Sequence, residues 1–538
     1  MFNSTIFFRF FTRLRFCFVC LIAILGSLFL LTATVQGSIE LDKHDLDNAT
    51  LITDSLKAAT EGDSTIVVGS TKYKRSKFGC LFFGKHYRKE WATPIKVPCL
   101  DITTAKGGLT PIKKGGGMQT KSLRFISKDS VEYTFRSIDK DIGGALKPVF
   151  QGTFVENFLQ DGISSAHPYG FLVVPYLAEA VGIFHTTPTI YYLPATDYLG
   201  EYRESFGDML GMLEVRPDDD LSAFSRFGYS KNVVSTDKLF EKLHENQEDK
   251  VDAWMYARAR LLDMLIGDWD RHQDQWRWAE FEKDSYAIYR PVPRDRDQAF
   301  VQFEGLLPWL TTRKWAMRKM KHFGGKVNDV KGMTMQAKDL DQSFLNEFSM
   351  DDWKLISDSV KQELTDSIIE LAVRQLPEQI FNISGKEIIE KLKSRRNGLV
   401  DYAVKFYQIL AKKAVLVGSN EQEWFEVERL DDKQTSLKMY AVDENGKKGR
   451  ILYERIFYSV ETDEIHLYGL GGNDCFEVSG EVSKGINLFL SGGSGLDSFE
   501  NNSIVRKGGN KLVVYIDEQE VGYVKEDKMM EVELLEKK

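Results

Sequence analysis

Two clusters of charged and polar residues lie close together within the stretch from Leu261 to Phe300. The first cluster runs from Asp268 to Gln275 and the second from Arg294 to Asp297. The residues between them read as a two-stranded hairpin, which would bring both clusters to the same end. Carboxylate and amide oxygens at such a place are suited to a hard divalent cation that arrives with phosphates. The stretch therefore predicts a metal and nucleotide site.

Phosphoryl transfer needs a carboxylate near the acceptor hydroxyl, groups that hold a metal, and a cation on the phosphates. Asp270 with Asp274 and Gln275 supplies the first set of groups, and Asp295 with Asp297 supplies the second. Positive side chains around both sets would keep the carboxylates ionised; they are Arg271, His272, Arg294 and Arg296. The alternative is a surface cluster of ion pairs, because runs of charge usually form solvated faces.

The segment before these clusters contains a glycine-rich turn between strand-like runs. Gly115, Gly116 and Gly117 follow one run, and a second run ends near Arg136. Consecutive glycines let backbone amides approach a phosphate closely. A flexible hairpin explains the same glycines, since the pattern is neither a dinucleotide-binding nor a Walker signature.

Length and composition indicate a large globular chain. The 538 residues are 43% apolar and 12% aromatic, which is enough for a sizeable core. A chain of this length suggests about two to four domains. The net charge of −8 argues against nucleic acid as a partner. After residue 37 only Cys80, Cys99 and Cys475 remain, so neither a disulfide framework nor a metal-ligand spacing is expected.

The N-terminal segment has the features of an export signal. Arginines precede an apolar run from Phe16 to about Thr32, and a small-residue motif ends at Gly37. We expect a signal peptide over residues 1–37, with a short membrane anchor as the alternative. Both cases place the protein outside the cytoplasm, in the periplasm or cell envelope or secreted. The polar, acidic residues 38–63 are expected to form a linker.

The periodicity of apolar residues divides the rest of the chain into three parts. Residues 64–217 favour a small sheet-rich lobe, residues 218–415 a larger helical lobe, and residues 416–538 a β-rich module. Within the second part, residues 251–268 predict an amphipathic helix. The cleft between the first two parts is the expected place for a ligand.

Two similar turns occur in the third part, GLGGNDCFEV from Gly469 and GGSGLDSFEN from Gly492. The second fits a calcium-binding nonapeptide repeat. Two copies are too few for a stable solenoid of that kind. Ca²⁺ at Asp474 and Asp497 and a β-rich accessory module without calcium therefore stay open as alternatives.

The central stretch resembles the CotH (spore coat protein H) family of secreted atypical protein kinases. GDWDRHQDQW is similar to the G-N-x-D-x-H-x-N-N loop of that family, and PVPRDRDQAF to its W-D-x-D-x-T-F strand end. Upstream, AEAVGIFHTTPTIYYLP and GDMLGMLEVRP look like its helix, strand and hinge strand. The D-R-H loop more loosely resembles lipid kinases, HipA-type kinases and secreted Golgi kinases. Residues 85–310 also look like a segment of large exported proteins of Bacteroidetes-type bacteria.

This resemblance implies an α+β, two-lobed protein-kinase-like domain that uses ATP with Mg²⁺ or Mn²⁺. By the matched positions, Asp270 would be the catalytic aspartate with His272 beside it. The metal ligands would be Asp274, Gln275, Asp295 and Asp297. Gln275 departs from the family's asparagine, which puts the metal geometry in doubt.

The resemblance also implies roles in the first lobe. Glu214 would lie in the hinge beside adenine. Arg136 is the first candidate for the cation on the phosphates, followed by Lys121 and Lys140, and Asp161 would be its helix partner. An arginine in place of the family's lysine is a second departure.

The expected function is that of an exported kinase acting on a hydroxyl of a protein or cell-surface molecule. An inactive kinase-like module for binding or envelope assembly is the alternative, and its β-rich tail would contact an outer-membrane or surface partner. AMP transfer is also left open. Metal-dependent hydrolysis is the weakest reading, because metallohydrolases favour several histidines and the site offers only His272.

Overall fold

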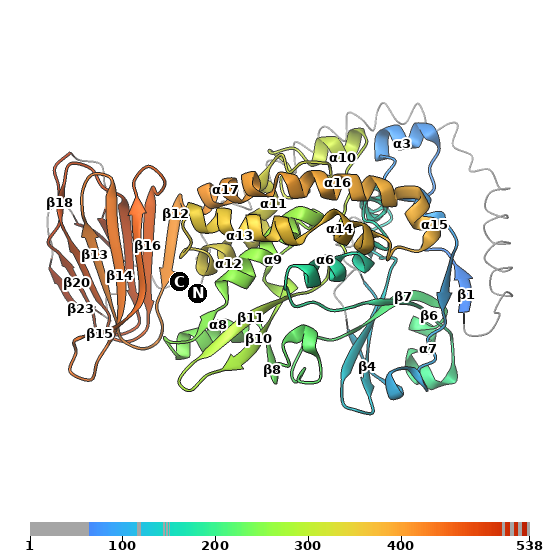
Figure 1. Cartoon of the computed structure of the whole chain (residues 1–538), viewed down its shortest axis with the longest axis horizontal. Helices are drawn as coiled ribbons and strands as arrows, with labels where there is room; N and C mark the ends of the chain where they lie inside the picture. The colour runs from blue at the N-terminus through green and yellow to red at the C-terminus, as the bar shows by residue number, and fades with distance from the viewer. Residues whose placement is uncertain are drawn as a thin grey trace.

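The computed structural model describes residues 64–115, 120–143, 146, 149, 151–507, 512–516, 521–525 and 530–534. The expected signal peptide (1–37), the expected linker (38–63), Gly116 and Gly117 lie outside the described residues. A search of the described part finds no helix long and apolar enough to cross a membrane. The chain is a mixed α/β structure in which the C-terminal β module lies at one end of the longest axis, and helices lie above a sheet in the rest of the molecule (Figure 1).

A five-stranded antiparallel sheet forms the first part. Its strands are β3 (Leu109–Gly115), β4 (Ser122–Ser127), β5 (Glu132–Ser137), β6 (Thr189–Leu193) and β7 (Met209–Val215). They lie in the order β3-β4-β5-β7-β6. Alternate apolar side chains fill a core on the sheet, among them Leu123, Phe125, Phe135 and Leu213. The sheet therefore places β5 at its centre.

Short helices and a small sheet flank this sheet. They are β1 (Ser64–Val67), α3 (Lys77–Phe83), α4 (Arg88–Ala92), β2 (Ile95–Pro98), α5 (Phe154–Gly162), α6 (Val174–Ala180) and α7 (Arg203–Phe206). Side-chain caps fix where two of these helices begin: Ser76 accepts a hydrogen bond from the amide of Gly79, and Thr153 accepts one from the amide of Val155. Pro175 lies in the first turn of α6, where its missing N–H costs no hydrogen bond.

The expected hairpin is confirmed. β10 (Trp276–Glu282) pairs antiparallel with β11 (Ala287–Pro293), and Trp276 faces Pro293 at the end where both polar clusters lie. β8 (Asn232–Ser235) and β9 (Lys250–Val251) complete a sheet of order β8-β10-β11-β9.

Helix α9 (Ala253–Ile266) lies at the centre of the molecule, and the prediction that it is amphipathic is wrong. Every residue of α9 except Trp254 is buried. Helices α6, α11, α13, α16 and α17 and strand β11 surround it. Its polar side chains face buried partners instead of water. The helix begins at Asp252, whose side chain accepts from the amide of Met255, and ends at Gly267 in a left-handed conformation.

The remaining helices are α8 (Thr236–Glu245), α10 (Leu306–Thr311), α11 (Val330–Thr334), α12 (Lys338–Phe344), α13 (Met350–Glu363), α14 (Asp366–Val373), α15 (Glu378–Ile380), α16 (Lys386–Asn397) and α17 (Leu399–Leu410). One hydrophobic core joins most of them to the flanking helices of the first part. Its largest fully buried side chains include Trp91, Trp276, Trp278 and Trp353.

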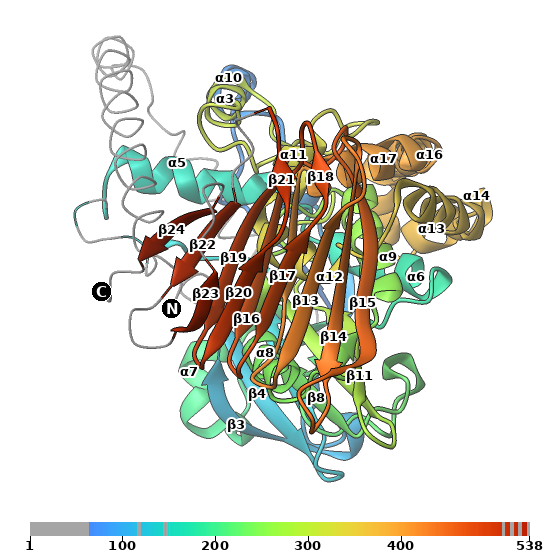
Figure 2. The ribbon, with the colours of Figure 1, turned by 90° about the vertical axis from the view of Figure 1, so that its left-hand side faces the viewer.

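The C-terminal module is a short parallel β-solenoid (Figure 2). One parallel sheet contains β12 (Lys413–Val417), β16 (Glu464–Leu470), β19 (Asn487–Gly493), β22 (Leu512–Ile516) and β24 (Met530–Leu534). The facing sheet contains β13 (Glu423–Arg429), β17 (Cys475–Ser479), β20 (Asp497–Asn501) and β23 (Val521–Lys525), extended antiparallel by β14 (Gln434–Val442) and β15 (Lys448–Tyr458). A third, short pair is β18 (Glu481–Val482) with β21 (Ile504–Val505).

The β-rich module is thus a solenoid although its sequence has only two Gly-Asp turns, because coils without that turn extend it on both sides. β12 and β13 pair in parallel with β16 and β17, so they add a coil before the first Gly-Asp turn. Strands β22 and β23 continue both sheets after the second turn. Asp474 and Asp497 are 23 residues apart, which is the length of one coil. Calcium at these turns stays a prediction.

Candidate nucleotide and metal site

Hydrogen bonds from Arg271 join the two polar clusters at the end of the hairpin. The amide of Arg294 donates to the carbonyl of Gln275 at 2.9 Å. The Arg271 guanidinium donates to the Arg294 carbonyl at 2.5 Å and to the Gln275 carbonyl at 2.9 Å. Because Arg271 is fully buried, it holds both loops from inside the protein.

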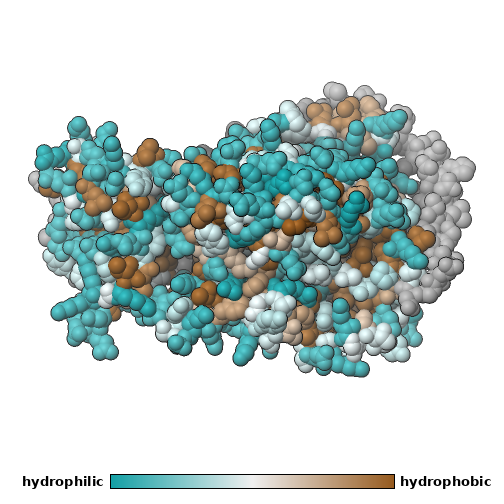
Figure 3. Space-filling view, viewed as in Figure 1, coloured by the Kyte–Doolittle hydropathy of each residue, from teal (hydrophilic) through white to brown (hydrophobic). Residues whose placement is uncertain are grey.

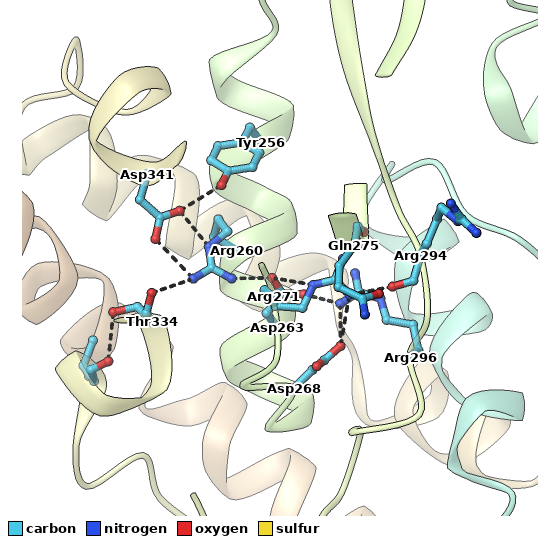
Figure 4. Close-up of polar contacts among 11 residues, drawn as sticks. Tyr256, Arg260, Asp263, Asp268, Arg271, Gln275, Arg294, Arg296, Thr334 and Asp341 are labelled. Atoms are coloured by element: carbon cyan, nitrogen blue, oxygen red, sulfur yellow. Dashed lines mark hydrogen bonds and ion pairs between the residues drawn. The ribbon is translucent and has the colours of Figure 1, made fainter. Parts of the chain in front are cut away.

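A buried network of ion pairs supports these loops (Figure 4). Its acidic members are Asp263, Asp268 and Asp341, and its basic members are Arg260, Arg271 and Arg296. Arg271 comes from the first loop and Arg296 from the second, and both contact Asp263 and Asp268. Each negative charge is matched by a positive one, as buried charges require.

Burial and the arginines act in opposite directions on these carboxyl groups. Burial disfavours the ionised form of Asp263, but the charges of Arg296, Arg271 and Arg260 outweigh it and hold its pKa below the usual value. Burial dominates at Asp268 and raises its pKa to about 6, although the charges of Arg271 and Arg296 oppose this. Arg260 also binds Asp341, which accepts a hydrogen bond from the hydroxyl of Tyr256 at 2.9 Å.

The second loop meets the five-stranded sheet through two ion pairs. Arg136, on β5, lies 3.2 Å from Asp295 and 3.6 Å from Glu214. Lys140, just after β5, pairs with Asp297. We call Asp295 and Asp297 the acidic pair. Of the three candidates for the phosphate-binding cation, the structure thus brings Arg136 and Lys140 to this pair.

The two aspartates of this loop differ in acidity. Burial opposes ionisation of Asp295, but Arg136, Lys140 and neighbouring arginines hold its pKa below the usual value. Burial and the adjacent charge of Asp295 raise the pKa of Asp297, although Lys140 opposes this. Asp295 also has a left-handed backbone, with φ of 54°, which is uncommon outside glycine. Asp295 stands between Arg294 and Arg296 in the sequence. Figure 4 shows the side chain of Arg296 pointing into the network and that of Arg294 pointing away from the network.

Two arginines beside this loop carry poorly compensated positive charge. The Nε groups of Arg277 and Arg294 are buried without a hydrogen-bond acceptor among the described residues. Burial, with repulsion from Arg277 and Arg136, lowers the pKa of Arg294 to about 10. An anion such as a phosphate would relieve both the repulsion and the unpaired donors.

The first loop is arranged differently from the expectation. Asp270 is half-buried and accepts a hydrogen bond from the side chain of Gln336 at 3.2 Å. Asp274 has 79% of its side chain exposed and lies 3.6 Å from His272. The side chain of Gln275 contacts His272 at 3.3 Å. Within the described chain, none of these contacts joins Asp274 or Gln275 to Asp295.

Two more of the expected site residues lie in or next to the five-stranded sheet, and they are placed differently. Gly115 pairs with Ser122, and Ser122 pairs with Arg136, so Gly115 lies on the same row of the sheet as Arg136. Lys121 instead contacts the carbonyl of Ser205 at 3.4 Å and stays away from the acidic pair.

The expected helix partner of Arg136 is wrong. Asp161 pairs with Arg88 at 2.6 Å and with Arg75 at 3.0 Å. The buried Arg88 and the exposed Arg75 both bind this carboxylate, so Glu214 and Asp295 are the partners of Arg136 instead.

Glu214 lies close to the acidic pair, since it contacts Arg136 and lines the same cavity as Asp295. It accepts a hydrogen bond from the hydroxyl of Thr186 at 2.6 Å. Together with Asp295 and Arg296 it lines a cavity of about 20 Å³, which holds about one water molecule.

Sequence reasoning missed four residues that support the site: Arg260, Asp263, Gln336 and Asp341. A signal for two of them exists, because Arg260 and Asp263 interrupt an otherwise apolar helical segment. Charged side chains in a buried helix need partners of opposite charge. Gln336 and Asp341 come from a distant segment and give no such signal.

The acidic pair suits a cation that arrives with phosphates better than a dedicated metal site. In the part of the chain that the structure describes, no group of three or more His, Cys, Asp or Glu residues is placed to hold a metal. Asp295 and Asp297 offer two carboxylates. Mg²⁺ is commonly bound by about one or two carboxylates together with substrate phosphates.

No protein-family model and no curated protein matches the sequence. Among solved structures, the chain is similar to the Helicobacter pylori proinflammatory kinase CtkA at 12% identity and a TM-score of 0.29, covering 57% of this chain and 97% of that chain. It is similar to HipA of Shewanella oneidensis MR-1, in a complex with HipB and operator DNA, at 12% identity and a TM-score of 0.26, covering 58% of this chain and 77% of that chain. These scores are too low to assign a fold, so the function must be argued from the site itself.

Proposed function

We propose that the chain is an exported kinase that binds ATP with Mg²⁺ or Mn²⁺ and transfers a phosphoryl group to a hydroxyl of a protein or cell-surface molecule. One observation carries the proposal: Arg136 and Lys140 of the sheet meet Asp295 and Asp297 of the second loop. Phosphoryl transfer depends mainly on positioning and charge neutralisation, and this pairing assembles both kinds of charge in one place.

Each of these residues has a defined part in the proposal. Arg136 and Lys140 exchange their carboxylate partners for phosphate oxygens, which frees Asp295 and Asp297. A divalent cation bound by the freed carboxylates would supply neutralisation of the phosphate charge. Arg294, whose buried Nε lacks an acceptor within the described chain, donates to the same anion.

Asp270 is the proposed acceptor of the proton from the substrate hydroxyl. Gln336 orients its carboxylate by donating to Oδ1. Arg271, the next residue, is locked in the buried network, so the loop has little freedom to move Asp270. A fixed carboxylate next to the reacting hydroxyl is what general base catalysis requires.

The arrangement of the elements supports a two-lobed, protein-kinase-like architecture. The sheet of order β3-β4-β5-β7-β6 receives helices between β5 and β6 and is followed by the helical part. The sheet also has a hydrophobic core distinct from the one that joins the helices. Export to the periplasm, cell envelope or medium is proposed from the apolar segment Phe16–Thr32.

A second candidate function is an inactive kinase-like module for binding or envelope assembly. The exposed Asp274 and the contact of Gln275 with His272 favour it, because the first loop then supplies no metal ligand. The β-solenoid would provide the surface that contacts an outer-membrane or surface partner.

Labelled ATP with Mn²⁺ and the purified full chain separate the two candidates. We expect Asp295→Ala to lose both the thermal stabilisation by ATP–Mn²⁺ and label transfer. We expect Asp270→Ala to lose transfer but to keep the stabilisation, and the exposed control Asp274→Ala to keep both. Stabilisation without transfer in the unaltered chain supports the inactive module, and no stabilisation at all contradicts the kinase.

A further inference from the structure

Two segments of this acidic protein are strongly basic. Residues 72–89 contain seven Lys or Arg and no Asp or Glu, and residues 305–322 contain five Lys or Arg and no Asp or Glu. The whole chain has a net charge of −8. Both segments therefore have a net positive charge within an acidic chain.

The fold brings these segments together as the helices α3 and α10, and we call their joint outer face the α3–α10 surface. The two helices lie side by side at the outer edge of the molecule in both views (Figures 1 and 2). Their backbones touch closely, since a Cβ on Gly84 would lie 2.3 Å from the carbonyl oxygen of Glu304. A Cβ on Gly305 would likewise lie 2.3 Å from the amide nitrogen of Gly84.

Large apolar side chains gather on the α3–α10 surface, where Figure 3 shows brown side chains over the two helices. The exposed fractions are 64% for Phe78, 63% for Leu81, 49% for Leu306, 53% for Trp309, 54% for Trp315 and 39% for Met317. A group of exposed aromatic and aliphatic side chains of this kind marks an interaction surface.

The same two segments also carry exposed basic side chains. Lys74, Lys77, Lys85 and Lys314 are exposed, and no residue of the described ranges forms an ion pair with them. The guanidinium of Arg313 lies 3.6 Å from the ring centroid of Trp309. The positive charge of Arg313 therefore lies next to the indole ring of Trp309.

We propose that the α3–α10 surface docks on a membrane that contains anionic lipids. Phe78, Leu81 and Trp309 would enter the boundary between headgroups and acyl chains, while the lysines contact the headgroups. Trp, Phe and Leu beside Lys and Arg are the side chains that interfacial segments use. An acidic protein partner fits less well, because the surface is an outer edge formed by two helices, and within the described residues the cavities lined by Asp431 and by Glu214 lie elsewhere.

Helix α10 is also close in sequence to the candidate site. Helix α10 begins shortly after Phe300, which ends the loop of Asp295 and Asp297. The inference does not depend on the proposed kinase activity, since it rests on exposure and charge alone.

Cosedimentation of the full chain with vesicles tests this inference. We compare vesicles of phosphatidylcholine alone with vesicles that also contain phosphatidylglycerol. The double variant Lys77→Glu with Lys314→Glu should bind the anionic vesicles at least about tenfold more weakly, because each basic residue near the surface contributes to attraction. The matched control, Lys433→Glu with Lys447→Glu on the β-solenoid, should bind like the unaltered chain.

The apolar segment Phe16–Thr32 is present in every protein compared, so differences between variants report on the α3–α10 surface. Equal binding of all three proteins to anionic vesicles would overturn the inference. Preferential binding to soluble polyglutamate would do so as well and would indicate an acidic protein partner.

A second measurement does not depend on the folding of the charge variants. Lipids brominated on their acyl chains should quench tryptophan fluorescence of the unaltered chain, and Trp309→Phe should reduce that quenching. Absence of quenching in the unaltered chain would contradict insertion of Trp309.

Discussion

Arg136 Nη1 lies 3.2 Å from Asp295 Oδ2, and this contact joins the centre of the five-stranded sheet to the loop after β11. The same guanidinium reaches Glu214 on the neighbouring strand β7. The arginine thus lies between two carboxylates, one from the sheet and one from the loop. A phosphate that binds here has to compete with both.

The first prediction concerns this arginine. Arg136→Met should weaken ATP–Mn²⁺ binding by about tenfold to a hundredfold, because hydrogen bonds between charged groups contribute about 1.5–3 kcal/mol. The thermal shift produced by increasing ATP–Mn²⁺ measures the change. Lys121→Met is the control, since the side chain of Lys121 contacts the carbonyl of Ser205 and not the acidic pair. A larger loss in the Lys121 variant would place the phosphate-binding cation elsewhere.

The second prediction concerns the buried ion network. Arg271→Met leaves Asp263 and Asp268 undercompensated, so the free energy of unfolding should fall by about 3–5 kcal/mol. Urea denaturation at neutral pH measures it. Lys354→Met removes an exposed pair with Asp351 and should change stability by less than about 1 kcal/mol. A comparable, small effect in both variants would show that the network does not stabilise the fold.

The third prediction is that the β-solenoid loses stability as pH rises. Burial raises the pKa of Asp474 to about 9 and that of Glu423 to about 7, from usual values of 3.8 and 4.5. Both groups therefore hold protons in the folded state that the unfolded chain releases. Their contribution is fully present below about pH 4 and is lost progressively up to about pH 9.

Thermal unfolding followed by circular dichroism between these pH values checks this prediction. The Asp474→Asn variant keeps an oxygen that can accept from the amide of Glu423, which is now bound to Asp474 at 2.8 Å. Its unfolding should depend much less on pH. Equal pH dependence in the variant and in the unaltered chain would rule out Asp474 as the cause.

The fourth prediction concerns the glycines of the solenoid turns. A Cβ on Gly492 would lie 1.8 Å from Asp497 Oδ2, and the other oxygen of that carboxylate accepts from the amide of Asp474. Gly492→Ala should therefore lower the free energy of unfolding by about 1–3 kcal/mol, as overpacking does. Urea denaturation compares it with Gly162→Ala.

Gly162 is a matched control because it has no atom within 4 Å of a built Cβ and has a helical backbone with φ of −57°. Alanine there should be neutral or stabilising by up to about 1 kcal/mol. An equal loss in both glycine variants would mean that the contact with Asp497 is not the cause.

Local patterns predicted the parts of the fold that depend on local sequence. The hairpin between the polar clusters follows from alternating apolar residues on two adjacent strands. The solenoid did not follow, because its first coil lacks a Gly-Asp turn: Glu423 stands in the place that Asp474 takes in the next coil. Only the pairing of distant strands reveals that coil.

The candidate site shows the same division. Asp270 and Asp295 could be named from their spacing, because both lie at one end of a hairpin. The partners of Arg136 could not be predicted from the sequence. Glu214 and Asp295 reach Arg136 only through the pairing of β5 with β7 and the packing of the loop. The spacing of Asp274 placed it in the site, but the loop turns its side chain to solvent.

Helix α9 has a further consequence, because protein surrounds it on all sides. Solvent cannot reach its peptide groups through fraying of one exposed face, as it can in a surface helix. Its amide protons should therefore exchange with deuterium only when the helices and the hairpin around it open together. The exchange rate along α9 would then report the global stability of the chain, and the last deuterium to enter the protein would mark the segment that carries Arg260 and Asp263.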